Sequence, residues 1–508
     1  MVDAQQEVES KFDVAPDFVL GDLQTLIRPG ETLATSHVEL ISSYYDTDRG
    51  DLLSSRLTLR QRTGDDDTGW HLKVPGDGFR TELRWPLTES GQLPPELSRL
   101  IEPFSHSTAV REQVRLRSHR TRHRIANADG MLRLDIADDE VWATPQGSPV
   151  TVPRWREVEV ELGPAGTNAD LAEAAGLLVE RGAFSSTSSS KLARALYGLP
   201  NPEDTPDTAG TALLRYLQAQ FDTFTAGHFA ISIKPFEPEA TAEPHEAVHQ
   251  TRVAIRRVRS ALRTFAPLFD KARAASLDAE LGWLAAELGE LRDREVLRAR
   301  LLRAVDDLPA YLVVGPVAER IDQVLLTELT AHADALVRTM RESRYHSLVD
   351  EMTQWRQAPP FTSAADKPVR SLSDHVAAAE RRLARRMKRA AARHASESDL
   401  HSARKAGKRA RYAAEAVAPT LGKRVDSLAK SAANLQSLLG EHQDSIVATE
   451  LLRRIADEVA DEGQNAFTYG ILVADQRRSA ADSARAAHEA ATRRASIADA
   501  ATGQSAKG

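Results

Sequence analysis

The 508-residue sequence contains no cysteine, and only 5% of its residues are aromatic. Without cysteine the chain can form no disulfides and no thiolate metal sites, which is typical of a reducing compartment. No run of about 18 apolar residues occurs, and the first residues lack a basic segment followed by an apolar one. The sequence therefore predicts no membrane-spanning helix and no secretory signal, and we expect a cytoplasmic protein.

The overall composition is ordinary for a globular protein, with 42% hydrophobic and 27% charged residues. The net charge of -7 conceals local clusters of both signs. A chain of 508 residues is too long for a single hydrophobic core, so two or more domains are expected.

The first two hundred residues consist of short segments with a period of two, which indicates β-strands. The segment Glu7–Lys11 places Glu7, Glu9 and Lys11 on one face. Later segments carry charge in the same phase: Arg60 and Arg62; Lys73; Arg80, Glu82 and Arg84; Arg120, Arg122 and Arg124; Asp135 and Asp139; and Glu157, Glu159 and Glu161. The clearest helical signals in this region are residues 93–101 and 168–181.

A single strand of this kind is usually a solvated face, and an exposed edge strand is the alternative interpretation of Glu7–Lys11. Six or seven such strands predict a closed antiparallel barrel with a charged lumen. Burying unpaired charge is costly, so ligands should compensate the inner charges. A polyphosphate chain with Mg²⁺ or Mn²⁺ supplies both signs of charge.

The ordered set of motifs, from the Glu-x-Glu-x-Lys opening to Ser190-Lys191, resembles the CYTH domain of the triphosphate tunnel metalloenzyme superfamily over residues 1–200. The resemblance implies an eight-stranded antiparallel β tunnel that hydrolyses or cyclises triphosphate compounds with a divalent metal. Arg84 departs from the family, because many members are acidic there. The implied metal ligands are Glu7, Glu9, Glu159 and Glu161, with Asp135, Asp139 and Glu157 as further candidates. The implied catalytic, phosphate-binding residues are Lys11, Arg60, Arg62, Lys73, Arg122, Arg124 and Lys191.

Residues 201–209 are predicted to be a linker, because Asn201–Thr208 holds two prolines, three acidic residues and no large apolar residue. From residue 210 to 494 the hydrophobic period changes to about 3.6, which predicts an all-α domain. Residues 495–508 are predicted to be a disordered tail.

The helical part contains an internal repeat. His249–Arg259 recurs as His401–Arg411, and Leu288–Asp293 recurs farther along as Leu439–Asp444. Two landmarks repeated in the same order predict two similar helical bundles related by a pseudo-twofold axis.

Basic residues form stripes in both copies. Three- and four-residue spacing places His249, Arg252, Arg256, Arg259 and Arg263 on one helix face. The second copy has His401, Arg404, Lys408 and Arg411, and another helix supplies Arg382, Arg386, Arg389 and Arg393. Like charges at this spacing repel, so the stripes favour an anionic ligand over a merely solvated basic face.

The R-x-x-x-R-R-x-R element of residues 252–259 and the L-G-x-x-x-D element resemble the CHAD domain, which is often fused to CYTH, over roughly residues 210–490. The resemblance implies binding of inorganic polyphosphate by the stripes just named together with Arg257, Lys405 and Arg409. A cytoplasmic protein of this kind could associate with polyphosphate granules.

The helical part allows two other interpretations. His245-Glu246-Ala-Val-His249 matches the H-E-x-x-H zinc-protease pattern, but Glu397 replaces His245 in the second copy and the arginines downstream oppose a cation. Nucleic acid is disfavoured by the scarcity of aromatic stacking residues and by the acidic net charge.

The sequence as a whole predicts a metal-dependent triphosphatase, using Mg²⁺ or Mn²⁺, fused to a polyphosphate-binding helical domain. The alternatives are a non-catalytic polyphosphate-binding sensor and a class IV-type adenylyl cyclase.

Overall fold

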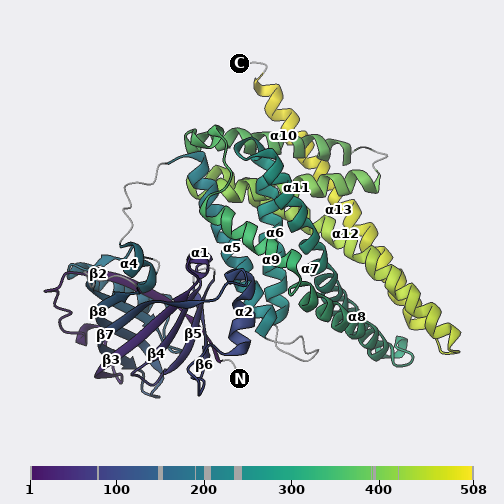
Figure 1. Ribbon diagram of the computed structural model, residues 1–508. Helices are drawn as coiled ribbons and strands as arrows, with labels where there is room; N and C mark the ends of the chain where they lie inside the picture. Colours follow the sequence, from purple (N-terminus) through teal and green to yellow (C-terminus); the bar gives the residue numbers. More distant parts are fainter. Residues whose placement is uncertain are drawn as a thin grey trace. The chain divides into compact units, whose positions relative to one another are not determined.

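The computed structural model describes residues 3–76, 79–146, 153–188, 190–198, 207–233, 243–390, 392, 396–421 and 423–505. The chain forms two compact units (Figure 1). Unit 1 contains Met1–Thr205, Phe221–Ile233 and Ser343–Gln357; unit 2 contains Pro206–Gln220, Lys234–Glu342 and Ala358–Gly508. Among the helices so described, none is both long enough and apolar enough to cross a bilayer.

Unit 1 is built on a ten-stranded antiparallel sheet with the order β1-β6-β5-β4-β3-β7-β8-β9-β2-β10. The strands are β1 (Asp3–Glu7), β2 (Glu9–Val14), β3 (Thr32–Asp46), β4 (Thr58–Thr63), β5 (Gly69–Pro75), β6 (Arg80–Trp85), β7 (Arg111–Ala126), β8 (Leu132–Pro145), β9 (Arg154–Leu162) and β10 (Phe184–Ser185).

The N-terminal segment links the two sides of this sheet. Only Val8 separates β1 from β2, yet β1 pairs with β6 and β2 pairs with β9. At the junction the N–H of Leu162 donates to the carbonyl of Val8 (3.0 Å). The segment predicted as one strand is therefore two, because it changes partner at Val8. Counted together they give the predicted eight-stranded antiparallel tunnel, with the two-residue β10 in addition, and the predicted tunnel fold is confirmed.

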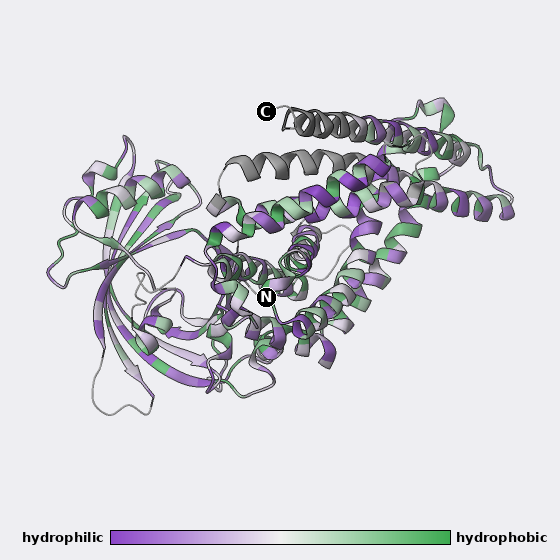
Figure 2. Ribbon diagram, turned by 90° about the horizontal axis from the view of Figure 1, so that it is seen from above, coloured by the Kyte–Doolittle hydropathy of each residue, from purple (hydrophilic) through white to green (hydrophobic). Residues whose placement is uncertain are grey.

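The two faces of the curled sheet differ in chemistry, and hydrophilic and hydrophobic residues alternate along the strands (Figure 2). On β9, Val158 and Val160 are fully buried in the core shared with α3 (Asn168–Glu180), whereas Glu159 and Glu161 line the interior. A Thr167–Asp170 capping box begins α3 and satisfies its first backbone donors. The period of two therefore places apolar residues outside, under a helix, and charges inside.

The short helix α4 (Lys191–Tyr197) positions the last predicted tunnel residue. Its Leu192 packs against Tyr44, Val114 and Leu116 of the sheet. The Ser190 hydroxyl accepts a hydrogen bond from the N–H of Ala193 (3.0 Å) and caps the helix. Lys191, the first helical residue, is thereby fixed at the interior of the sheet.

The other helices of unit 1 include α1 (Asp51–Ser54) and α2 (Pro95–Ser105). Residues 93–101 were predicted to be helical, and α2 begins two residues later because Pro95 takes the first helical position. Unit 1 also holds α9 (Ser343–Gln357) and the second half of α5 (Ala209–Ile233), both from beyond the predicted linker. Within unit 1, Asp222 pairs with Arg356 and with Arg56 (2.6 Å).

Unit 2 is helical, as predicted. Besides the start of α5, it contains α6 (Glu243–Thr264), α7 (Lys271–Asp306), α8 (Val317–Thr339), α10 (Leu372–Ala390), α11 (Glu397–Leu421), α12 (Lys423–Asp461) and α13 (Phe467–Ser505). The repeated landmarks fall on corresponding helices, α6 with α7 and α11 with α12. The helix α13 continues to Ser505, which differs from the disordered tail expected from Ala495; this segment is rich in alanine, a strong helix former.

Helix packing explains the glycine and the aspartate of the L-G-x-x-x-D element in its first copy. A Cβ on Gly289 would lie 3.3 Å from Arg252 Nη2, so the missing side chain lets the guanidinium of α6 lie across α7. Asp293, one turn later on α7, accepts a hydrogen bond from Arg252 Nη1 (2.7 Å). The glycine makes the room and the aspartate fixes the arginine.

Candidate functional site

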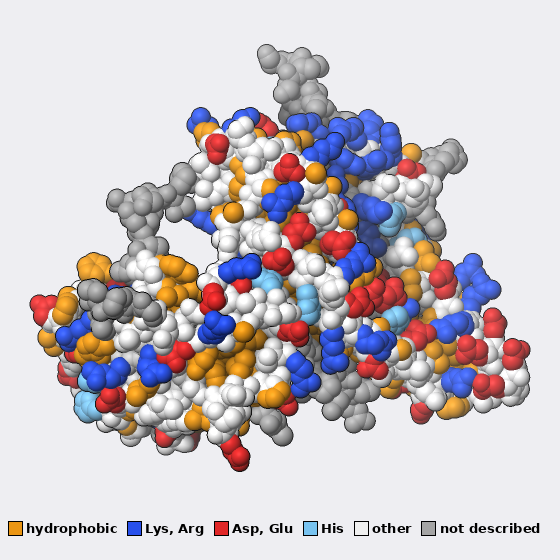
Figure 3. All heavy atoms as spheres, in the orientation of Figure 1, with side chains coloured by type: hydrophobic (Ala, Val, Ile, Leu, Met, Phe, Trp, Pro, Cys, Tyr) orange, Lys and Arg blue, Asp and Glu red, His pale blue; other side chains and the backbone are white. Residues whose placement is uncertain are grey.

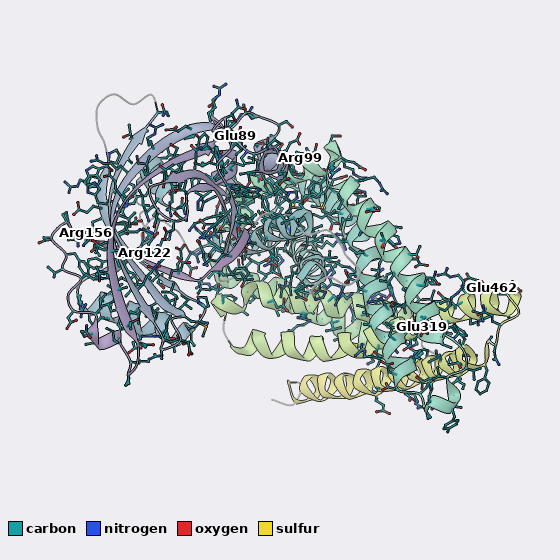
Figure 4. All side chains as sticks on the ribbon, turned by 90° about the horizontal axis from the view of Figure 1, so that it is seen from below. Glu89, Arg99, Arg122, Arg156, Glu319 and Glu462 are labelled. Atoms are coloured by element: carbon teal, nitrogen blue, oxygen red, sulfur yellow. The ribbon has the colours of Figure 1, made fainter. Side chains whose placement is uncertain are left out.

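A cavity of about 310 Å³ lies inside the curled sheet of unit 1. Figure 4 shows Arg122 on the inner side of the sheet and Arg156 on the outer side. The predicted site residues that line the cavity are Glu7, Glu9, Lys11, Arg60, Arg62, Lys73, Arg122, Arg124, Asp135, Glu159, Glu161 and Lys191. The fold therefore gathers most of the predicted tunnel site into one space.

The remaining two tunnel residues, Asp139 and Glu157, are held by Lys191. Its Nζ lies 3.0 Å from Asp139 Oδ2, 2.6 Å from Glu157 Oε1 and 2.8 Å from Glu159 Oε2. Burial alone would lower the lysine pKa, but Glu157, Glu159 and Asp139 raise it. Ligand oxygens of the three carboxylates lie within 4.8 Å of one another, as in a metal site. Because the ammonium already contacts all three, a metal ion would have to displace it.

A second carboxylate group comprises Glu7, Glu9 and Glu161. Glu7 Oε2 lies 2.6 Å from Lys73 Nζ, and Glu9 Oε1 lies 3.3 Å from Lys11 Nζ. Glu161 has no ion pair within the described part of the chain. Burial, and then repulsion by Glu7, raises the pKa of Glu161 to about 7. This surplus of negative charge fits a hard divalent cation, whose preferred ligands are carboxylate oxygens.

Glu82 was not among the predicted site residues, yet it organises the basic side of the cavity. It is 1% exposed, and its oxygens lie 2.9 Å from Arg60 Nη2, 2.6 Å from Arg84 Nη2 and 3.2 Å from His71 Nδ1. Although burial would raise it, the pKa of Glu82 is held well below its usual value by Lys73 and Arg60. The sequence signal was available, because Glu82 alternates in phase with Arg80 and Arg84.

Arg120 and Tyr44 also line the cavity without having been predicted as site residues. Arg120 was recognised as in phase with Arg122, and it contacts Asp139 (2.7 Å) and Glu159 (3.3 Å). Burial would raise the phenol pKa of Tyr44, but nearby Arg60, Lys191 and Arg62 lower it below the usual value. No sequence pattern singled out Tyr44, because it lies on a long strand with few other charges on its inner face.

A groove of about 280 Å³ in unit 2 has a strongly basic lining. The predicted polyphosphate-binding residues that line it are Arg256, Arg259, Arg263, Arg382, Arg386, Lys405, Lys408 and Arg409. In Figure 3, Lys and Arg side chains gather over α10 and α11. The repeat thus brings the stripe of α6, the stripe of α11 and the basic face of α10 to one surface.

Several arginines of the predicted stripes already have acidic partners. Arg252 pairs with Asp293 on α7. Arg259 and Arg263 share Asp278, at 3.0 and 2.7 Å. In a separate contact, Glu415 accepts from both Arg257 (3.1 Å) and Arg411 (2.6 Å). These residues carry less net charge for a ligand than the sequence suggests.

Other cations of the groove are not neutralised in this way. No ion pair of Arg256, Lys408 or Arg409 occurs within the described ranges of the chain. The Nε atom of Arg256 is buried and has no hydrogen-bond partner. Burial, and then repulsion by Arg404, Arg256 and Arg252, lowers the pKa of Lys408 to about 7. This cluster has the excess positive charge expected of an anion site.

The other predicted groove residues lie around its margin or outside the described residues. Four of them do not line the groove: His249, His401, Arg389 and Arg404. Arg404 lies near Lys408. Burial, and then repulsion by Arg292, lowers the pKa of His249. Arg393 lies outside the described residues, as does the side chain of His245 from the H-E-x-x-H pattern.

Comparison with protein-family models matches residues 5–195 to the CYTH domain and residues 225–453 to the CHAD domain. Two Mycobacterium tuberculosis proteins, named as the uncharacterized proteins MT2285 (strain CDC 1551) and Rv2226 (strain H37Rv), are each 31% identical to this chain over 509 aligned residues. Each alignment covers 96% of this chain and 96% of the relative.

Two solved structures resemble the chain over about half its length. PptA from Streptomyces chartreusis is 24% identical, with a TM-score of 0.45, and the match covers 56% of this chain and 99% of that one. The CHAD domain from the plant Ricinus communis is 24% identical, with a TM-score of 0.43, covering 56% and 93%.

The curled antiparallel sheet with a charged interior, followed by a duplicated helical unit with a basic groove, defines a two-domain protein of the triphosphate tunnel type. The chain belongs to the family of CYTH–CHAD fusion proteins, in which a CYTH domain precedes a CHAD domain.

Replacing Lys191 by Met should strongly destabilise unit 1, because it removes the one ammonium that all three neighbouring carboxylates share. Breaking a buried charge cluster in this way costs about 3–5 kcal/mol of unfolding free energy. Mn²⁺ should recover part of the loss in K191M by replacing the missing cation. Tryptophan fluorescence during denaturation measures both effects.

The control is Arg111→Met, which breaks an exposed 3.9 Å pair with Asp48 and should cost less than about 1 kcal/mol. Equal stability of K191M and R111M would contradict the role given to Lys191.

Proposed function

We propose that the tunnel of unit 1 hydrolyses a phosphoanhydride bond of inorganic triphosphate or a related triphosphate compound with a divalent metal, Mg²⁺ or Mn²⁺. We further propose that the groove of unit 2 binds inorganic polyphosphate. One observation carries the first proposal: a single cavity holds arginines suited to phosphate together with a carboxylate group that has too few cations of its own.

The arginines of the cavity are suited to bind and orient phosphate. Each guanidinium can donate two parallel hydrogen bonds to phosphate oxygens. Arg60 lines the cavity and is held by Glu82. Arg122 and Arg124 approach from β7, held by Asp135 (2.6 and 3.4 Å). The chain's own contribution to catalysis is therefore positioning and stabilisation of charge on the phosphate being cleaved.

The acidic side of the cavity is suited to hold the metal. Glu7, Glu9 and Glu161 offer hard oxygen ligands, and a divalent cation would relieve the repulsion by Glu7 that, together with burial as the larger cause, raises the pKa of Glu161. When bound, a metal would neutralise charge on the phosphates and acidify the attacking water. Lys11 and Lys73 contact the same carboxylates and can keep them oriented between substrate and metal.

The wild-type protein should release phosphate from triphosphate in the presence of Mg²⁺ or Mn²⁺, and Glu9→Gln should lower kcat/KM by about a hundredfold or more, because it removes a metal ligand. A colorimetric phosphate assay across triphosphate, longer polyphosphates, thiamine triphosphate and ATP measures both statements. Glu140→Gln is the matched control, since Glu140 pairs with Arg154 on the outer face at 3.1 Å.

Absence of phosphate release by the wild-type protein from every compound would leave a binding protein and refute hydrolysis. Cyclic nucleotide as the product from ATP would instead identify a cyclase.

Two arginines of one stripe should differ in their importance for polyphosphate. Arg256→Ala should weaken binding about tenfold, because Arg256 is half-buried in the groove and has no ion pair with any described residue. Arg263→Ala removes the same charge from the same helix, but Asp278 already offsets it, so the loss should be about threefold or less. Dissociation constants from fluorescence anisotropy at fixed salt give the comparison, and equal losses would contradict the selective role of Arg256.

Polyphosphate affinity should fall as pH rises above about 7. The pKa of Lys408 is lowered to about 7 in the free groove, and a bound polyanion raises it by attraction. The complex therefore holds more protons than the free protein above that pH, and affinity is lost by up to about tenfold per pH unit. Below pH 7 Lys408 is charged in both states and contributes no dependence.

In Lys408→Arg the charge persists across this range, so the affinity should be nearly constant from pH 7 to 9. A wild-type profile equally flat would show that Lys408 does not titrate on binding.

A further inference from the structure

The turn between β4 and β5 carries three consecutive aspartates, Asp65, Asp66 and Asp67, and all three line the tunnel cavity. An anion-binding cavity gains nothing from extra carboxylates of its own. Neither the proposed binding of phosphate nor the proposed metal site uses these residues.

The turn is fixed in place by two glycines. At Gly64, with φ of +108°, a Cβ would lie 2.1 Å from the carbonyl oxygen of Glu39, and at Gly69 a Cβ would lie 2.4 Å from that of Trp85. Only glycine allows the backbone to approach so closely. From β5, His71 Nε2 lies 2.6 Å from the carbonyl oxygen of Asp67 in the turn. The aspartates are therefore held toward the cavity by the backbone.

Two of the carboxylates occupy cations that the proposed function assigns to phosphate. Asp67 Oδ2 lies 2.7 Å from Arg62 Nη1, and Asp65 Oδ2 lies 3.4 Å from Arg122 Nη1. Asp66 is exposed and has no ion pair with any residue that the structure describes. For Arg62 and Arg122, carboxylates of the protein itself therefore occupy the place that a phosphate would take.

A guanidinium of the cavity wall lies next to these carboxylates. The side chain of Arg60 is only 7% exposed and lines the cavity, and its buried Nε has no hydrogen-bond partner among the residues that the structure describes. Asp67 is near enough to Arg60 to raise its pKa. The cavity wall thus places a buried guanidinium, which suits an anion, beside a fixed group of carboxylates.

We infer that Asp65, Asp66 and Asp67 limit the length of the phosphate chain that the tunnel accepts. The inference rests on the proposed function and refines it. A chain whose terminal phosphate reaches Arg60 meets a guanidinium, whereas a longer chain must place its next phosphates against three carboxylates. Repulsion between fixed charges at such short range is strong in a partly buried site. The three aspartates are specificity-determining residues for short chains over long ones.

The test compares kcat/KM for linear triphosphate and linear pentaphosphate in the full-length protein with Mn²⁺. The wild-type protein should prefer triphosphate, and D65N/D66N/D67N should reduce this preference at least about tenfold. D66N alone keeps both arginine contacts and should reduce it about threefold, through loss of charge only. The control D129N removes an exposed carboxylate outside the cavity and should leave the preference unchanged.

An unchanged preference in both D66N and the triple variant would overturn the inference. An equal gain in kcat/KM for triphosphate and pentaphosphate would overturn it as well. Circular dichroism checks the fold of the triple variant, and D66N supplies the answer if that variant does not fold.

If the wild-type protein releases no phosphate from either chain, the proposed hydrolysis fails while the length limit remains measurable. The readout is then the ratio of dissociation constants for the two chains, by titration calorimetry in an Arg256→Ala background that weakens the groove. A ratio that the triple variant leaves unchanged would overturn the inference in this case too.

Discussion

Pairing of opposite charges across the inner face is the constraint on which the tunnel depends. A curled sheet with carboxylates and guanidinium groups inside folds only if these groups compensate one another in the absence of ligand. Lys191 does this for three carboxylates, and Glu82 does it for Arg60 and Arg84. The departure from this balance, at Glu161, is the position where ligand chemistry is best supported.

The helical unit obeys the same rule in a simpler form. Its stripes look uniform in sequence, but Asp278 and Asp293 neutralise part of them, and the charge left over is concentrated around Arg256 and Lys408. Each domain can therefore be understood from the charge that its own ion pairs leave uncompensated. That charge is positive in the groove, and the tunnel has charge of both signs.

Much of this arrangement was predictable, because strand and helix periods record which side chains share a face. The in-phase charges from Glu7 to Glu161 predicted the lumen, and the duplicated His249 and His401 segments predicted the helical unit. Periodicity does not reveal which charges meet across strands. The contacts of Lys191 with Asp139 and of Arg263 with Asp278 depend on register and helix packing, so the sequence could not separate structural pairs from open donors. Tyr44 was missed because a lone aromatic residue leaves no periodic signal.

The single residue Val8 has a consequence for how the chain is made. Its two flanking strands pair with β6 and with β9, and β9 ends only at Leu162. During synthesis the first strands to leave the ribosome must wait for one of the last strands of the domain before the ring is complete. Such pairing between distant segments slows folding and leaves an unpaired strand edge in the meantime. Nascent chains of this domain are therefore open sheets, exposed to edge-to-edge association until β9 has emerged.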